Sequence, residues 1–345
     1  GNYELASIKS VSANCIILNS PLRRTYFVGG ALQLIRVPYY ANATVVGTLT
    51  AAPWNGSTGG VLAFIVSGTL TLNASIDVSD KGFRGGIAPA GSFSCNASAY
   101  YFPIGSLDGG NKGEGIGVLS NLKKLGRGAQ ANGGGGGNNN NSGGGGGSNF
   151  SAGGRGGDQV LYSTCLGIPI GGEAGTALTS IQTQNKIFLG GGGGSGHQND
   201  NNNQGIDGKN GGGIVFISAN NIAGNGNSIK TNGTNNTQLP FTDGAGAGGA
   251  GGTMVLDVNN YSGLLNLELN GGDGGSINSP LYCLGVGGGG SGGVLQYKGS
   301  ALPSNVNVSL IGGESGKQIN PGSSCYQSNW GGADGQNGAS FNNYS

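Results

Sequence analysis

The chain has 345 residues, of which 79 are glycine, and it carries a net charge of +1 with only 9% charged residues. Because typical soluble domains contain about 25% charged residues, this composition excludes a charged disordered tail, and it lacks the clustered Lys and Arg of a nucleic-acid-binding surface. Hydrophobic residues make up 35%, too few for a large apolar core. No stretch approaches the roughly 18 apolar residues of a transmembrane helix.

The first third of the chain has the pattern of short β-strands. Its apolar segments are rich in Val, Ile, Leu and Thr, and each is bounded by Gly, Asn or Pro. Thr69–Leu72 alternates polar and apolar residues, which is the period of a half-buried strand. We therefore predict almost no helix, and strands at Ala31–Val37, Ala43–Leu49, Val61–Val66, Thr69–Leu72 and Ser75–Val78.

A repeated pattern connects this region with the C-terminal part of the chain. Each copy has a Gly-Gly pair, an apolar strand and then a second short strand. In the last three copies the second glycine lies at 213, 252 and 293, and these spacings of 39 and 41 indicate stacked supersecondary units. The first copy begins at Gly59, so either a large insertion or degenerate copies separate it from the second.

The glycines also form uninterrupted runs, and two interpretations of these runs remain open. They are either flexible loops or polyglycine-II helices, which have three residues per turn and pack closely only where no Cβ holds the backbones apart. We favour the helices, and then expect exposed turns at Asn138–Asn141 and Asn201–Asn203. The runs are Gly133–Gly137, Gly143–Gly147, Gly190–Gly194 and Gly287–Gly290.

These patterns together predict a mainly β fold. We expect short strands stacked as in a β-solenoid or β-sandwich, accompanied by Gly-rich segments of the polyglycine-II type. Composition divides the chain into a strand-rich region at 1–105, a Gly/Asn-rich insertion at 106–211 and the Gly-Gly-strand repeats at 212–345. One integrated domain is the alternative to this division.

The five cysteines contain no C-x-x-C spacing, so zinc and thioredoxin-type sites have no support. Cys15 begins an apolar run and is expected to be a buried free thiol. The other four lie in Gly/Ser-rich text, and proximity favours the disulfides Cys95–Cys165 and Cys283–Cys325. The two other connectivities and four free thiols remain as alternatives.

The sequence offers no convincing catalytic, metal or cofactor site. The single histidine, His197, lies between Ser195 and Asp200, but a catalytic triad needs a rigid geometry that a loop does not supply. The G-x-S-x-G match at Gly289–Gly293 is expected by chance in a glycine run and lacks a strand-turn-helix context. We therefore expect a protein that is not an enzyme.

Two sets of residues are candidates for surface roles. Trp54, Tyr100, Tyr101 and Trp330 lie in loop-like text, where exposed aromatic rings suit contacts with sugars or proteins. Packing against the Gly-rich layer is the alternative for these rings. Eleven N-x-[ST] sequons are candidates for glycosylation, at Asn42, Asn55, Asn73, Asn96, Asn140, Asn149, Asn232, Asn235, Asn260, Asn307 and Asn343.

Three stretches carry a resemblance to a known group of proteins: Gln33–Tyr39, Ala52–Ala63 and Ile76–Gly86. This text resembles a recurring segment of large Gly-rich surface proteins of Bacteroidota and related bacteria, which are adhesin-type cargo of the type IX secretion system. More loosely, the chain is similar to Gly-rich phage tail-tip adhesins and to the Gly-rich ectodomain of some receptor kinases. The resemblance implies a surface location and no catalytic residues, although no C-terminal sorting domain is recognisable.

We therefore expect a secreted or cell-surface structural or adhesive protein, with a filament subunit as one form of it. Its signal peptide would already be removed, because the chain begins without a basic and apolar leader. The expected partners are further copies of the chain, other surface proteins or glycans. A carbohydrate- or receptor-binding tip is the main alternative, and a β-solenoid enzyme that degrades polysaccharides is a weaker one.

Overall fold

The computed structural model describes residues 1–27, 32–93, 98–159, 170–179, 186–200 and 206–342. The elements assigned within these ranges are β-strands, which confirms the mainly β prediction. The strands are β1 (Ile8–Ser12), β2 (Cys15–Leu18), β3 (Tyr39–Tyr40), β4 (Ala43–Val45), β5 (Val61–Leu72), β6 (Ile76–Asp77), β7 (Ile214–Ala223), β8 (Ser228–Lys230), β9 (Thr253–Ser262), β10 (Leu265–Glu268), β11 (Val294–Tyr297), β12 (Val306–Ser309) and β13 (Ala339–Phe341).

The four copies of the repeat stack side by side as parallel strands. One sheet has the order β13-β11-β9-β7-β5-β3, with β4 also pairing with β5, and a second sheet has the order β12-β10-β8-β6. Each copy supplies one strand to each sheet, and the first residues of their apolar strands are in register: Val61, Ile214, Thr253 and Val294. The arrangement is solenoid-like, and the first two copies pair directly in spite of the insertion between them.

The hydrophobic core lies where the inward faces of these strands meet. Leu70 and Leu72 of β5 are fully buried, as the alternating pattern predicted, and they join one cluster with Ile217, Ile229 and Leu267. Because the same positions recur in each copy, every added coil extends this cluster instead of starting a new one. A modest fraction of apolar residues is therefore enough to fill the core.

The strand predicted at Ala31–Val37 is wrong for its described residues. Residues 32–38 are not a strand, and regular pairing begins only at β3. The side chain of Gln33 takes the place of a backbone ladder, since its Oε1 accepts from Gly59 N at 3.0 Å and its Nε2 donates to Gly59 O at 3.3 Å. Pro38 also lacks the amide hydrogen that a ladder needs.

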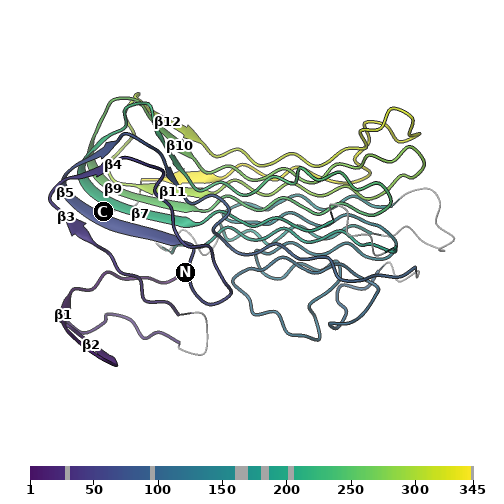
Figure 1. Ribbon diagram of the computed structural model, residues 1–345, viewed down its shortest axis with the longest axis horizontal. Coiled ribbons are helices and arrows are strands. Elements are labelled where there is room, and N and C mark those ends of the chain that lie inside the picture. Colours follow the sequence, from purple (N-terminus) through teal and green to yellow (C-terminus); the bar gives the residue numbers. More distant parts are fainter. Residues whose placement is uncertain (28–31, 94–97, 160–169, 180–185, 201–205, 343–345) are drawn as a thin grey trace.

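Beyond the strands, the chain runs out and back in long extended segments that form a bundle (Figure 1). The segment 190–196 shows how they are joined. Every third amide donates to one neighbouring segment of opposite direction: Gly190 to Gly212 O, Gly193 to Lys209 O and Gly196 to Ile206 O, at 2.9, 2.9 and 2.8 Å. A step of three residues per hydrogen bond is the period of polyglycine II.

The remaining amides of this segment reach two further neighbours. Gly191 and Gly194 donate to the segment 145–148, whereas Gly192 and Ser195 donate to the segment 111–114. One extended segment is thus hydrogen-bonded to three others around its axis. The glycine runs are therefore an ordered bundle that satisfies its backbone groups between segments, as polyglycine-II packing requires.

Glycine is needed in the bundle because the backbones touch. A Cβ placed on Gly145 would lie closer than 3.0 Å to the Glu173 carbonyl oxygen, and one on Gly194 would meet the Gly135 carbonyl oxygen in the same way. Real Cβ atoms essentially never come so close to a backbone oxygen. The obstacle is main chain, which has no rotamer to move aside, so the close approach itself excludes larger residues.

Side chains replace missing neighbours at the surface of the bundle. Asn270, Asp273 and Ser276 lie three residues apart and accept hydrogen bonds from the next segment, from the amides of Ile311, Glu314 and Lys317 at 2.9, 2.8 and 3.1 Å. In the preceding coil, Asn232 and Asn235 accept from the amides of Asn270 and Asp273 in the same manner. The three-residue period of the bundle therefore dictates where Asn, Asp and Ser occur.

The prediction of exposed turns at Asn138–Asn141 is wrong. All four residues are buried, because the turn is packed inside other reversals of the chain: Asn138 Nδ2 donates to Ala99 O at 2.8 Å and Asn141 Nδ2 to Thr242 O at 3.0 Å. Here the Asn side chains fill hydrogen-bonding positions that water would fill at an exposed turn. Asn201–Asn203 lie outside the described residues.

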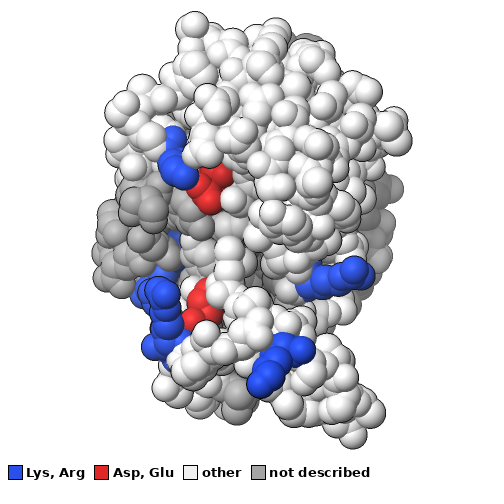
Figure 2. All heavy atoms as spheres, turned by 90° about the vertical axis from the view of Figure 1, so that its left-hand side faces the viewer, with Lys and Arg blue, Asp and Glu red and all other residues white. Residues whose placement is uncertain are grey.

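The strand end of the molecule has two further features. The hairpin β1–β2 lies apart from the sheets, and most of its residues are exposed on both faces (Figure 1). Figure 2 looks at this end and shows few charged side chains scattered among uncharged ones. The paucity of charge in the sequence is thus also a property of this surface.

We predict that Gly145→Ala destabilises the protein by about 3 kcal/mol or more, because its Cβ would meet the Glu173 carbonyl. Gly47→Ala is the matched control, since a Cβ at Gly47 has nothing within 4 Å, and its effect is expected to stay within about 0.5 kcal/mol. Chemical denaturation measures the free energy of unfolding of both variants. Equal stability of the two variants would contradict a tightly packed bundle.

Candidate binding surface

An extended segment carrying two tyrosines lies along the outside of the bundle. It pairs with the stretch 121–128: Phe102 N donates to Leu125 O at 2.9 Å, Gly128 N to Tyr100 O at 2.8 Å and Ile104 N to Asn121 O at 2.7 Å. Phe102 points inward and is buried, whereas its neighbours face outward. We call the exposed side chains of this pair of segments the flank surface, consisting of Tyr100, Tyr101, Ile104, Leu122 and Lys123.

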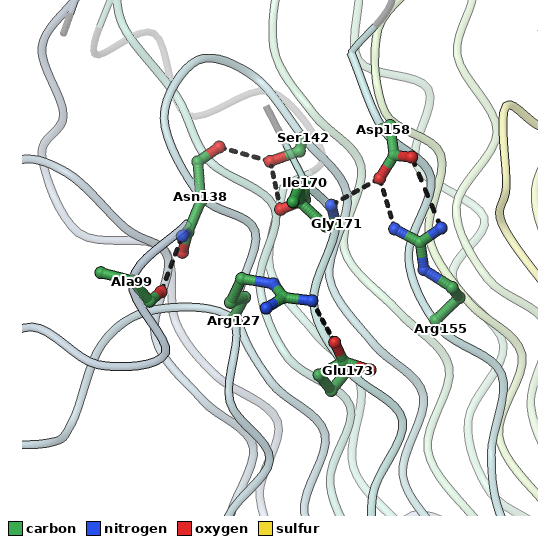
Figure 3. Close-up of polar contacts among 9 residues, drawn as sticks. All are labelled: Ala99, Arg127, Asn138, Ser142, Arg155, Asp158, Ile170, Gly171 and Glu173. Atoms are coloured by element: carbon green, nitrogen blue, oxygen red, sulfur yellow. Dashed lines mark hydrogen bonds and ion pairs between the residues drawn. The ribbon is translucent and has the colours of Figure 1, made fainter. Parts of the chain in front are cut away.

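Tyr100 is held by a buried arginine. The Arg127 guanidinium lies over the Tyr100 ring, 4.5 Å from its centroid. Figure 3 shows the ion pair that Arg127 also forms with Glu173. Tyr100 as a residue stays 58% exposed. An aromatic ring with one face on a fixed cation and the rest in solvent is a preorganised contact for a partner.

Tyr101 is placed by a similar contact on the same segment pair. Lys123, which is itself exposed, places its Nζ 5.3 Å from the centroid of the Tyr101 ring, and Tyr101 is 55% exposed. Leu122 and Ile104 add exposed aliphatic area next to the rings. Aromatic rings beside aliphatic groups and cations suit a sugar ring or a protein side chain, which present apolar faces with polar edges.

Ion pairs inside the bundle fix the segments beneath this surface. Arg155 pairs with Asp158, whose Oδ1 also accepts from Gly171 N at 2.9 Å (Figure 3). Ser142 Oγ donates to Ile170 O at 3.1 Å and also contacts Asn138 O. The segment 170–173 is thus anchored at both ends, and with it the carboxylate of Glu173 that pairs with Arg127.

Two of the four aromatic residues predicted for binding, Trp54 and Trp330, are less accessible than the tyrosines. Trp54 is 8% exposed and packs edge-on against Phe83, with ring centroids 5.6 Å apart, beside Leu189 and Ile214. It anchors the start of the bundle to the sheet, so the packing alternative is the correct one for this residue. Trp330 is half-buried in a turn, with a backbone φ of 45° and an indole N–H that is buried.

The structure tests part of the cysteine predictions. Cys283 and Cys325 form a disulfide with a Cα–Cα distance of 5.7 Å, which joins two turns at the far end of the bundle. Cys95 and Cys165 lie outside the described residues. Cys15 is a free thiol as expected, but it is exposed and not buried, because the hairpin that carries it packs against no core.

The sequons differ in whether their asparagine is accessible. Asn140 and Asn149 are buried, and Asn149 Nδ2 donates to Gly251 O at 2.8 Å inside the bundle, so the folded chain excludes a glycan at both. Asn232 is half-buried, and Asn96 and Asn343 lie outside the described residues. The exposed candidates are Asn42, Asn55, Asn73, Asn235, Asn260 and Asn307.

His197 is buried at the far end of the bundle and has a structural place. Its Nδ1 accepts from Asn141 N at 3.1 Å and its Nε2 therefore carries the proton, which points to Leu107 O at 3.1 Å. Burial lowers the pKa of His197 to about 4, so the ring is neutral near pH 7. Both ring nitrogens are engaged in these two hydrogen bonds.

A buried carboxylate, that of Asp243, lies next to the residue that bonds His197: Gly244 N donates to His197 O at 3.0 Å. Asp243 is fully buried, and its Oδ1 accepts from Asn199 N at 3.0 Å. Burial, followed by a side-chain hydrogen bond with Asp200 and the charge of Asp200, raises the pKa of Asp243 to about 7. Among the residues the structure describes, no group of three or more His, Cys, Asp and Glu side chains is arranged to hold a metal ion.

The sequence indicated the tyrosines but not the cations that contact them. Arg127 lies between two glycines, and its side chain reaches Tyr100 only because the segments pair in one register. Two patterns in the sequence could have indicated this pair of segments: the alternation around Tyr100–Phe102 and the polar stretch Asn121–Lys124. The register in which the two segments pair depends on backbone hydrogen bonds between glycines. Because glycine has no side chain, the sequence contains no pattern from which this register could be predicted.

Comparisons with protein-family models, with curated proteins and with solved structures found no match. Within the described ranges, no helix is long and apolar enough to cross a membrane.

We predict that acid destabilises the protein through His197. Its pKa falls from an ordinary 6.5 to about 4 on folding, so its contribution is present above pH 6.5 and is lost as the pH falls towards 4. Asp243 acts in the opposite direction, because its raised pKa makes the folded state gain stability as the pH falls below 7.

The variant His197→Gln isolates the histidine. Urea unfolding at pH 7 and at pH 4.5 is expected to show a smaller acid-induced loss of stability in the variant, by up to about 3 kcal/mol. An identical loss in both proteins would show that the ring is not buried in its neutral form.

Proposed function

We propose that the chain is an extracellular, non-enzymatic adhesive module of a cell surface, in which the polyglycine-II bundle is a rigid support for a binding surface. The observation that carries this proposal is the flank surface, where two exposed tyrosines each contact a cation and one of these cations, Arg127, is buried and paired with Glu173. The ligand class we propose is a surface glycan or the side chains of another surface protein.

Three properties of the chain support a surface role. The bundle is held by backbone hydrogen bonds, so it needs few charges and little apolar area, and its rigidity is independent of surface ion pairs. The Cys283–Cys325 disulfide fits an oxidising compartment. Exposed sequons such as Asn260 and Asn307 leave room for glycans on the strand side.

A double variant tests the binding surface directly. Tyr100→Ala combined with Tyr101→Ala removes both rings while leaving Arg127 and the backbone pairing in place, and we expect at least a tenfold loss of affinity in a glycan-array or cell-surface binding assay. Aromatic side chains at the centre of an interface commonly carry losses of this size when truncated.

Tyr39→Ala is the matched control, since this tyrosine is 67% exposed but lies in β3 at the strand end. It is expected to bind as the wild type does. Loss of binding in the control with full binding in the double variant would move the site away from the flank surface and reject this proposal.

Self-association is a second candidate function, which the open ends of the larger sheet favour. In the described part of the chain, β3 and β13 are its two end strands, and a parallel strand of another copy fits beside β13. The bundle beside them is less open, because the amides of Ile311, Glu314 and Lys317 are already bonded to side chains. Association is therefore proposed through strands alone.

The variant Ser340→Pro tests this second function. Ala339 N donates to Gly293 O at 3.1 Å, towards the neighbouring strand β11. Because successive amides of a strand point in opposite directions, the Ser340 amide points away from β11, to the open edge of the sheet. Proline at 340 therefore removes only the hydrogen-bond donor at the open edge. If β13 joins copies, negative-stain images of the wild type at high concentration show filaments that the variant lacks. Dispersed wild-type monomers would reject it.

A further inference from the structure

Two buried oxygen atoms at the far end of the bundle have no hydrogen-bond donor. Asp243 is 0% exposed, and its Oδ2 has no partner although its Oδ1 accepts from Asn199 N. Asn141 is 3% exposed, and its Oδ1 also has no partner although its Nδ2 donates to Thr242 O at 3.0 Å. Each unsatisfied buried oxygen costs about 1–3 kcal/mol, so two of them, on a residue bonded to Thr242 and on the residue that follows Thr242, require a reason.

A second carboxylate lies at the same place. Asp200 accepts a hydrogen bond from Thr242 Oγ1 at 2.7 Å, and its carboxyl is close enough to that of Asp243 for the two to share a hydrogen bond when one of them is protonated. Asp243 has no ion pair with a Lys, Arg or His among the described residues, and the imidazole of His197 nearby is engaged by Asn141 N and Leu107 O. Two carboxylates side by side with one of them buried are a costly arrangement without a cation.

The donor set identifies the kind of cation. It consists of two carboxylates, one carboxamide oxygen and the oxygens of Thr242, without cysteine and without a free imidazole nitrogen. Oxygen-only sets with carboxylates and amide oxygens are preferred by Ca²⁺, which accepts six to eight ligands in flexible geometry and keeps water in the remaining positions. Softer metals that prefer sulfur or imidazole do not fit.

We propose that Asp243, Asp200, Asn141 and Thr242 form a calcium site at the far end of the bundle. These residues come from three separate chain reversals, at 138–142, 197–200 and 240–244. A bound cation would supply the donor-free oxygens with a partner and cross-link the reversals. The site goes beyond the proposed binding role, because it concerns how the end of the bundle is held together.

Calcium binding to the full-length wild type tests the proposal. After treatment with EDTA, isothermal titration with CaCl₂ is expected to show one site, and saturating calcium is expected to raise the midpoint of thermal unfolding by about 3 °C or more. The absence of both a heat of binding and a shift of the midpoint would overturn the proposal. It would indicate that Asp200 and Asp243 share a proton or bind water instead of a calcium ion.

Two variants at the site and one control locate the ion. Asp243→Asn and Asp200→Asn each remove one charge and keep the shape, so both are expected to lose at least tenfold in calcium affinity and most of the thermal shift. Asp334→Asn is the control. The Asp334 carboxylate lies outside the proposed site and accepts a hydrogen bond from Ser315 N at 2.7 Å, and the carboxamide oxygen of asparagine can accept the same hydrogen bond. An unchanged shift in both site variants, or its loss in the control, would place the ion elsewhere and overturn the proposal.

Discussion

The hydrogen bond from a glycine amide to the carbonyl of a neighbouring extended segment is the interaction on which this molecule depends. In a sheet, such bonds lie in one plane, but in the segment 190–196 they turn by a third of a revolution with each residue and reach three neighbours. The bundle therefore satisfies its backbone in three dimensions, and it needs neither helices nor a wide apolar core to become compact.

This constraint explains the composition of the chain. Glycine fills the interior of the bundle because a Cβ would strike a carbonyl, and Asn, Asp or Ser fill the surface rows because their side chains accept amides that have no neighbouring segment. Apolar residues are concentrated in the strands, where the coils stack and bury them. Charged residues are few, and most of the described ion pairs join different segments, as Arg127–Glu173 and Lys230–Glu268 do.

Sequence alone predicted the repeats well and the irregular parts poorly, for physical reasons. The strands of the four copies follow from apolar periodicity, and the pairing of β5 with β7 follows from the equivalence of their copies. The burial of Asn138–Asn141 and His197 could not be predicted, because it depends on which reversals of the chain lie against each other. The exposure of Cys15 was not predicted for a similar reason. An apolar run usually packs into a hydrophobic core, but the hairpin that carries Cys15 packs against none.

The pairing of β5 with β7 has a consequence for how the chain acquires its fold. Val61 meets Ile214, so the first coil waits for a partner that is synthesised 153 residues later. At about 5–20 residues per second, that delay lasts roughly 8–30 s, during which an apolar strand edge has no native neighbour. Contacts of such sequence separation also slow folding through the entropy of closing long loops. The order of synthesis thus makes the N-terminal coil the part of the chain most exposed to wrong pairing, and the C-terminal coils the ones able to form first.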